Sequence, residues 1–181
     1  MLLRLLFIVL SLGMLAGCAA TGPTAQGKAP QVVQPSATAI GADIVAQLGM
    51  VQVPTDKALI YLFRPERYIG SANTYQITVN GTPIADMRIG TRAPYLVPPG
   101  QATLQGRSLA NILNIGLSLG LMEEPFIAFV VEAGKVYFID VQTGFAGGPQ
   151  FEFVDATTGL EAIKGMGLAP PPKPEEGAKA Q

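Results

Sequence analysis

The chain has 181 residues, a formal net charge of −1, a single cysteine, and neither histidine nor tryptophan. Without histidine, a nucleophile triad that uses histidine and a histidine-ligated zinc site are both excluded. The scattered charges form no basic patch, which argues against a nucleic-acid partner.

The chain begins with a short apolar run that is typical of a secretion signal. Arg4 precedes a run from Leu5 to Leu15 that is broken only by one serine and one glycine. About ten apolar residues are too few to span a bilayer core of about 30 Å, which takes about twenty residues in a helix. We therefore expect residues 1–17 to be a cleaved signal peptide rather than a membrane-spanning anchor.

The end of this run, Leu15-Ala16-Gly17-Cys18, resembles the lipobox of bacterial lipoproteins. The resemblance implies cleavage between Gly17 and Cys18, a diacylglycerol on the Cys18 thiol, and a further acyl chain, typically palmitate, on the new amine. Three acyl chains anchor a protein firmly, since each buried CH₂ contributes about 0.8 kcal/mol. Ala19 replaces the aspartate that holds lipoproteins at the inner membrane, which implies the outer membrane, facing the periplasm. The alternative is an ordinary signal followed by a chance cysteine.

Two segments flank the part of the chain that can fold. Residues 18–54 are rich in Ala, Pro, Gln, Thr and Gly, which predicts a flexible tether with a short helical patch at 40–48. Residues 169–181 are rich in Pro, Glu and Lys, which predicts a disordered tail. The remaining residues, 55–168, are enough for one domain with its own core.

Apolar residues in this domain recur with a period of two, which predicts strands. A mostly buried strand is expected at 57–64, and Pro65 ends it because proline cannot donate to a strand ladder. Asn80-Gly81 suits the positive φ angles of a two-residue turn and predicts a hairpin between 75–79 and 82–89. The other predicted elements are strands at 94–97, 102–106, 126–132, 136–141 and 151–154, turns at 98–100 and 133–135, the latter a second hairpin, and a short helix or edge strand at 157–163.

These short strands with regular turn signals predict an all-β fold, a small antiparallel β-sandwich. Four motifs occur in a fixed order, namely ALIYLFRP at 58–65, VNG at 79–81, VPPG at 97–100 and EAGKVYF at 132–138. Together they resemble the DUF2846 family of uncharacterised bacterial domains, many of which are lipoproteins. The resemblance covers about residues 55–165 and implies a small sandwich, which we expect to be Ig-like or PEGA-like. It implies no activity and no site residues.

One apolar segment, residues 109–122, is inserted between two predicted strands. Its length favours a helix with Ser108 as the cap, although 113–121 also alternates and its two glycines each cost a helix about 1 kcal/mol. We expect the segment to cover one face of the sandwich. The alternative is an exposed patch that contacts the bilayer or a partner protein through Leu113, Leu117 and Leu121.

A polar cluster follows the first buried strand, and its members are Arg64, Glu66, Arg67 and Tyr68. It is a candidate binding site for an anion or a carboxylate, because arginine binds such groups through paired hydrogen bonds. The interpretation that we favour is structural: Arg64 pairs with an acid and ties down the loop, while Arg67 is solvated.

Catalysis has less support than binding. A glycosidase needs two carboxyl groups about 5 to 9.5 Å apart, and the sequence alone brings no two acids together. A G-x-S-x-G pattern occurs at 116–120, but the chain has no histidine that could activate its serine, and it has no calcium-loop pattern. We therefore expect no enzyme activity, no cofactor and no metal, but a non-catalytic envelope module that meets the membrane through Cys18 and has a protein partner. The alternative is a carboxylate-dependent hydrolase of the cell envelope, whose candidate acids are Asp86, Glu123, Glu124, Asp140, Glu152 and Asp155.

Overall fold

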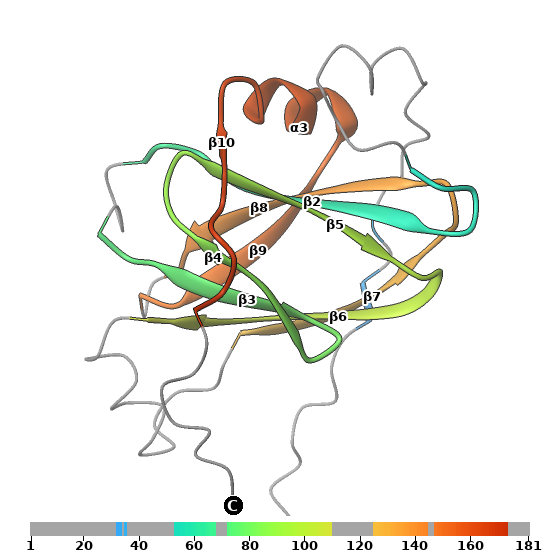
Figure 1. The fold of residues 1–181 in the computed structure, drawn as a ribbon, viewed down its shortest axis with the longest axis horizontal. Coiled ribbons are helices and arrows are strands. Elements are labelled where there is room, and N and C mark those ends of the chain that lie inside the picture. The colour runs from blue at the N-terminus through green and yellow to red at the C-terminus, as the bar shows by residue number, and fades with distance from the viewer. Residues whose placement is uncertain are drawn as a thin grey trace, which may run out of the picture.

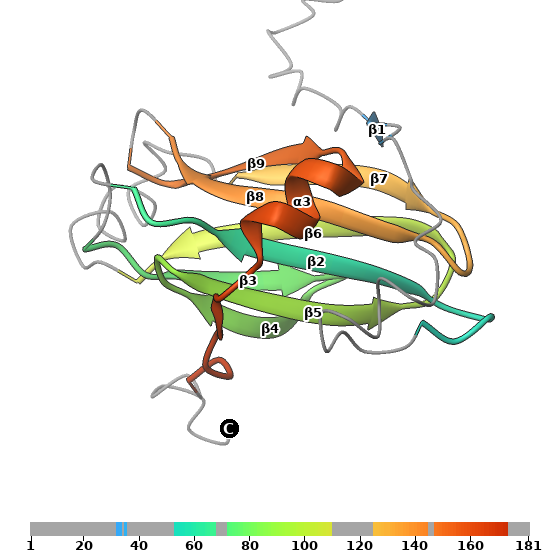
Figure 2. The ribbon, with the colours of Figure 1, turned by 90° about the horizontal axis from the view of Figure 1, so that it is seen from above.

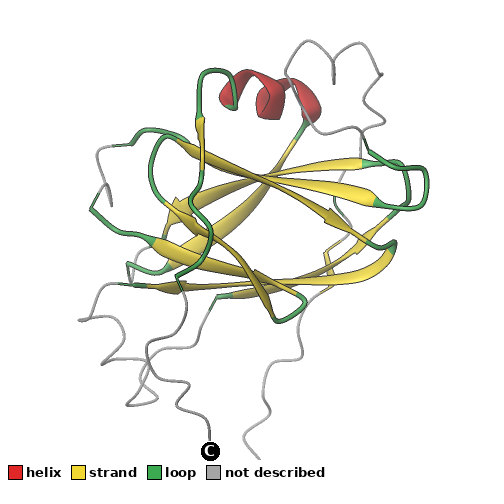
Figure 3. Ribbon diagram, in the orientation of Figure 1, coloured by secondary structure: helices red, strands yellow, loops and turns green. Residues whose placement is uncertain are grey.

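Ten strands and one helix make up the described part of the chain, which in this computed structural model is residues 32–33, 35, 53–67, 72–109, 125–144 and 147–173. The strands are β1 (Val32–Val33), β2 (Ala58–Arg64), β3 (Tyr75–Val79), β4 (Thr82–Met87), β5 (Thr91–Val97), β6 (Gly100–Ser108), β7 (Phe126–Val131), β8 (Val136–Thr143), β9 (Pro149–Val154) and β10 (Gly167–Leu168). The helix, α3 (Ala156–Ala162), separates β9 from β10 (Figure 3).

The strands form two five-stranded sheets that lie face to face (Figure 1). The first sheet has the order β1–β7–β6–β3–β4, and the second has the order β10–β5–β2–β8–β9. Helix α3 lies on the outer face of the second sheet (Figures 1 and 2). The predicted all-β sandwich is therefore confirmed.

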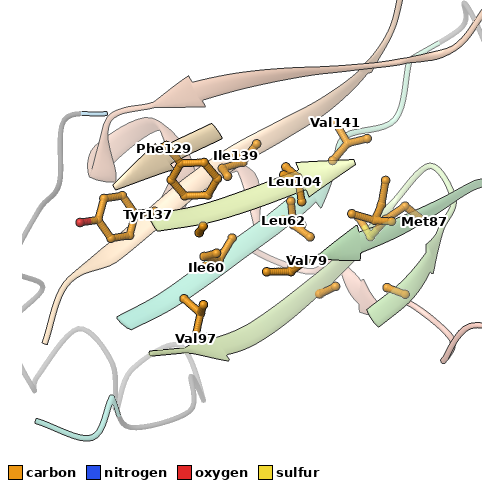
Figure 4. Packing of buried hydrophobic residues seen from close by; sticks show 14 of the residues in the cluster. Ile60, Leu62, Val79, Met87, Val97, Leu104, Phe129, Tyr137, Ile139 and Val141 are labelled. Atoms are coloured by element: carbon orange, nitrogen blue, oxygen red, sulfur yellow. The ribbon is translucent and has the colours of Figure 1, made fainter. Parts of the chain in front are cut away.

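The core is organised around β2, in which every residue is buried. The even-numbered residues, Ile60 and Leu62 among them, face the first sheet, and Figure 4 shows both side chains pointing into the space between the sheets. The odd-numbered residues from Leu59 to Phe63 face outward and pack beneath α3. A strand covered on both faces has a continuous apolar sequence rather than an alternating one, and this strand has such a sequence.

The second sheet is not purely antiparallel, which differs from the prediction. β2 and β8 pair in parallel, with Leu59 opposite Val136 and Phe63 opposite Asp140. A parallel pair needs a long connection, and here the chain between the two strands builds β3 to β7. The short edge pairs β1–β7 and β10–β5 are also parallel. Alternation along a strand indicates which residues share a face and carries no information about strand direction.

The first of the two predicted hairpins is confirmed and the second is wrong. Asn80 and Gly81 have φ angles of 50° and 75° and join β3 to β4. The turn at 133–135 is present, with Gly134 at a φ of 73°, but β7 belongs to the first sheet and β8 to the second. This turn therefore carries the chain from one sheet to the other, and β8 forms its hairpin with β9 instead. A glycine at a tight turn gives the same signal in the sequence whether the two flanking strands pair with each other or enter different sheets.

Parts of both predicted flexible segments belong to the sandwich. In the predicted tether, β1 pairs with β7. After β10, the Ala169 N–H donates to the carbonyl of Arg92, and the Asp86 N–H donates to the carbonyl of Pro170. The prediction of a disordered tail is therefore wrong for residues 169–173. These pairings are made by the backbone, so no apolar period in the sequence announces them.

Several predicted features lie outside the described residues: the signal with Gly17 and Cys18, the patch at 40–48, residues 110–122 and residues 174–181. Ser108, which was predicted to cap a helix, is the buried last residue of β6, opposite Tyr75 on β3.

Helix α3 resolves the choice between a helix and an edge strand near residue 157. Asp155 caps the helix, because its Oδ1 accepts a hydrogen bond from the backbone N–H of Thr158 at 3.0 Å. The hydroxyl of Thr158 also donates to the Asp155 carboxylate, and this bond, together with the one from the N–H, lowers the pKa of Asp155. Gly159 is the buried residue of the helix and faces the ring of Phe138 on β8. The absence of a side chain at this position lets the helix lie close to the sheet.

We expect Gly159→Ala to lower the free energy of unfolding by about 1 to 3 kcal/mol, because a Cβ there would overlap the Phe138 ring. The sign of this change in the free energy of unfolding is informative, since alanine at an exposed helix position is favoured over glycine by about 1 kcal/mol. Urea unfolding followed by circular dichroism measures the change. Gly167→Ala is the control: its Cβ would meet nothing within 4 Å, and it should change stability by less than about 0.5 kcal/mol. Equal stability of the two variants would contradict the close packing of α3.

Candidate functional site

Strand β2 ends in a buried charge, Arg64, which is 3% exposed and points between the sheets. Its Nη1 donates to the backbone carbonyls of Asn73 at 2.7 Å and Met87 at 3.3 Å, and its Nη2 donates to Oγ1 of Thr143 at 3.3 Å. The guanidinium carbon lies 4.3 Å from the ring centre of Tyr75, a cation–π contact. Burial lowers the pKa of Arg64, but a guanidinium stays protonated. These contacts therefore replace the water that the charge has lost.

Tyr75 extends this network to the loops at the same end of the sandwich. Its hydroxyl lies 3.0 Å from Oγ1 of Thr143 and 3.0 Å from the carbonyl oxygen of Gly147, and Nδ2 of Asn73 donates to it at 3.3 Å. The network joins the end of β2, the start of β3 and the turn between β8 and β9. We call Arg64, Asn73, Tyr75 and Thr143 the Arg64 cluster. Because it is internal, its geometry is that of a structural tie rather than of a receptor for a dissolved anion.

Arg67 lies on the opposite face of the second sheet, where it meets Asp140. Its Nη2 is 2.5 Å from Oδ2 of Asp140, and Nε2 of Gln142 donates to the same oxygen at 3.2 Å. The same Nε2 also donates to a carboxylate oxygen of Glu152, which is opposite Asp140 on β9. We call these four residues the Asp140 cluster. It links the loop after β2 to two neighbouring strands.

The carboxylate of Asp140 is poorly solvated, since the residue is 4% exposed and its Oδ1 is buried with no hydrogen-bond partner. Burial raises the pKa of Asp140 above its ordinary value, and the charge of Arg67 offsets part of this rise. Glu152, which reaches solvent, raises the pKa a little further by repulsion. The ionised form of Asp140 is therefore less favourable in the folded protein than in the unfolded chain.

The predicted site residues do not form one site. Arg64 lies inside the sandwich, where its hydrogen-bond partners among the described residues are carbonyl and hydroxyl oxygens. Arg67, predicted to be solvated, pairs with Asp140 on the outer face. Glu66 lines a separate open cavity of about 230 Å³ with Gly90, Ala162, Lys164, Gly165 and Met166. Tyr68 lies outside the described residues, as do Gly17, Cys18, Leu113, Leu117 and Leu121.

A polar row that the sequence did not reveal crosses the outer face of the first sheet. Nε of Arg107 donates to Oε1 of Gln76 at 2.9 Å, and Gln76 is opposite Asp86 on β4. Asp86 is buried, and its Oδ2 accepts from the backbone N–H of Lys173 at 3.1 Å. This acid, a candidate for catalysis on sequence grounds, therefore helps to hold residues 170–173 on the edge of β4.

Neither a metal-binding group nor a membrane-spanning helix is found among the described residues. No three acidic, cysteine or histidine side chains among them lie close enough together to hold a metal ion. No helix within the described ranges is long and apolar enough to cross a membrane.

We expect Arg64→Lys to lower the free energy of unfolding by about 2 kcal/mol, because an ammonium cannot serve all the acceptors of the guanidinium fork at once. Chemical unfolding measures the loss. Arg67→Lys is the matched control, since Arg67 is half exposed and a lysine can still pair with Asp140, so a change below about 1 kcal/mol is expected. If Arg64→Lys were as stable as Arg67→Lys, the structural role of the Arg64 cluster would be wrong.

The raised pKa of Asp140 sets the sign of a pH dependence. Between its unfolded value of about 4 and the higher folded value, the folded state binds more protons than the unfolded chain, so stability falls as the pH rises. Asp140→Asn removes the titrating group. The stability of Asp140→Asn relative to the unmodified protein should therefore increase from pH 4 to pH 7, as measured by urea unfolding at several pH values. A difference that stayed constant over this range would contradict the raised pKa.

Comparison with known proteins places the chain in a family. A family model described as a protein of unknown function, DUF2846, matches residues 54–155, from just before β2 to the N-cap of α3. No curated protein matches the chain. Because the match covers more than half of the sequence and all but two of the described strands, the chain belongs to the DUF2846 family.

Proposed function

We propose that this chain is a non-catalytic module of the bacterial cell envelope, anchored by acylated Cys18 and held at the outer membrane facing the periplasm. The observation that carries the proposal is Leu15-Ala16-Gly17-Cys18 at the end of a short apolar run. Cys18 is the only cysteine in the chain, so no disulfide within the chain accounts for it. Acylation at the end of a signal sequence gives this one thiol a function.

The arrangement of the buried polar groups supports a non-catalytic role. Arg64 binds backbone and hydroxyl oxygens, Asp86 holds residues 170–173, and Asp140 pairs with Arg67. Each of these charged groups attaches one segment of the chain to another. A binding module of this kind offers its loops and faces to a partner on a rigid scaffold.

We propose that a protein partner is met at the end of the sandwich that carries the Arg64 cluster. The N–H of Leu109 donates to the carbonyl of Thr74, and the N–H of Gly106 donates to the carbonyl of Pro125. The residues on either side of the apolar segment are therefore fixed to this end of the first sheet. Contacts through Leu113, Leu117 and Leu121 would be made from here.

One observation favours the alternative, a carboxylate-dependent hydrolase. Asp140, with its raised pKa, and the exposed Glu152 both accept hydrogen bonds from Gln142, so two carboxyl groups of different environment lie close together. The support is weaker, because Oδ2 of Asp140 is bound by Arg67 and Gln142 while Oδ1 is buried. A general acid must reach the leaving group of its substrate.

We expect Cys18→Ala to abolish incorporation of labelled palmitate and to remove the protein from the outer-membrane fraction of a bacterial host, because the thiol is the site of lipid attachment. Metabolic labelling and membrane fractionation measure both effects. Ala19→Asp is the matched control: it should keep the label and shift the protein to the inner membrane. Palmitate labelling of Cys18→Ala equal to that of the unmodified protein would refute the lipid anchor at this residue.

A further inference from the structure

Strand β1 fixes the point at which the predicted tether meets the domain. Val32–Val33 pairs with β7, with Val32 opposite Ala128 (Figure 2). Val32 follows Cys18 by about 14 residues, whereas the predicted tether extends about 35 residues, to residue 54. By random-coil scaling, the pairing of β1 shortens the reach of the tether from about 30 Å to about 20 Å. The edge formed by β1 and β7 is therefore the part of the domain held nearest to Cys18.

This edge carries exposed apolar side chains. Val32, Phe126 and Val130 are 56%, 38% and 40% exposed. Phe129 and Val131 belong to the core, so the alternate residues of β7 face outward from the first sheet, and Val32 lies beside them through its pairing with Ala128. We call the three exposed residues, Val32, Phe126 and Val130, the β7 patch; Ala128, between Phe126 and Val130 on the strand, is buried.

The neighbouring strand adds no negative charge to this surface. The outward residues of β6 that are opposite this stretch of β7 are Gln101, Thr103 and Gln105, all uncharged. An apolar strip with an aromatic ring and neutral polar neighbours suits the boundary between headgroups and acyl chains.

We propose that the β7 patch rests on the bilayer in which Cys18 is anchored, with the β10 edge of the second sheet turned away from the membrane. The inference rests on the proposed function, because the acylated cysteine brings this edge to the bilayer. Pairing of β1 with β7 sets which edge approaches, and the exposed side chains of Phe126 and Val130 make the contact. The domain thus has a fixed side toward the membrane rather than tumbling at the end of a long tether.

The sequence allows a direct test, because the chain has no tryptophan and one cysteine. The chain from Cys18 onward is coupled through its thiol to a maleimide lipid in vesicles of phosphatidylethanolamine and phosphatidylglycerol. One tryptophan is introduced by Phe126→Trp or, as the control, by Leu168→Trp on β10, where the leucine is 68% exposed. Bromine-labelled lipids then quench tryptophans that reach the acyl chains.

We expect the bromine-labelled lipids to remove at least about half of the emission of Phe126→Trp, since an interfacial side chain reaches the acyl boundary, and to leave Leu168→Trp unquenched. Equal quenching at the two positions would overturn the proposal, because the domain would then have no preferred side. Absence of quenching at both would overturn it as well, since the domain would stand clear of the bilayer and the β7 patch would not contact lipid.

A second set of variants tests the role of β1. Val32→Pro combined with Val33→Pro removes both N–H donors of this strand, so the free tether lengthens and the quenching of Phe126→Trp should fall toward that of Leu168→Trp. A urea unfolding curve of the double variant that matches the curve of the unmodified chain would show that the core is intact. Undiminished quenching would contradict orientation by β1. Chemical coupling replaces acylation in cells, so the two tests are independent. A negative quenching result would contradict the orientation and not the lipid anchor, and a negative palmitate labelling result would contradict the anchor and not the orientation measured on vesicles.

Discussion

Burial of β2 on both faces is the constraint on which the rest of the structure depends. A strand that is apolar on both sides must be covered on both. Here the first sheet covers the even-numbered residues, such as Ile60 and Leu62, while α3 covers the odd-numbered residues from Leu59 to Phe63. The second cover requires the helix to approach the sheet closely, which Gly159 permits at Phe138. β8 can pair in parallel with β2 because the connection between them is long enough to build the covering sheet first. The order of the elements along the chain therefore allows both faces of β2 to be covered.

The polar interior follows from the same strand. β2 continues one residue beyond its apolar run, so Arg64 is carried between the sheets and must find acceptors there. The fold supplies them from Asn73, Met87 and Thr143, and these bonds hold the chain at one end of the sandwich in place. A buried charge costs stability unless it is paired, but where it is paired it favours one arrangement of loops over others. The buried charged residues that were candidates for catalysis or binding thus hold the fold together. The surface and the proposed lipid anchor are therefore the places to look for function.

The local signals in the sequence predict local structure well. A continuous apolar run located β2, Pro65 marked its end, and Asn80-Gly81 placed a hairpin, because each signal depends on residues that are adjacent in the chain. The partners of each strand depend on distant residues, so the Gly134 turn and the direction of β2 against β8 were predicted wrongly. The same limit applied to the site. Arg64 and Arg67 are three residues apart in sequence, but Arg64 lies between the sheets and Arg67 lies on the outer face of the second sheet. The two positions cannot be told apart without knowing that α3 covers that outer face.

The ends of the folded chain cover sheet edges, and one of these ends leads back to the proposed anchor. Exposed sheet edges invite pairing with other chains, and here β1 covers part of β7, β10 covers part of β5, and residues 170–173 lie along β4. Among the described residues, β9 has a neighbour on one side only, and Glu152 places a charge on that edge. A tether that ran free as far as β2 would leave β7 open and would let any side of the domain face the membrane. Pairing two of its residues with β7 covers part of this edge, and under the proposed anchor the same pairing sets which edge lies nearest to Cys18.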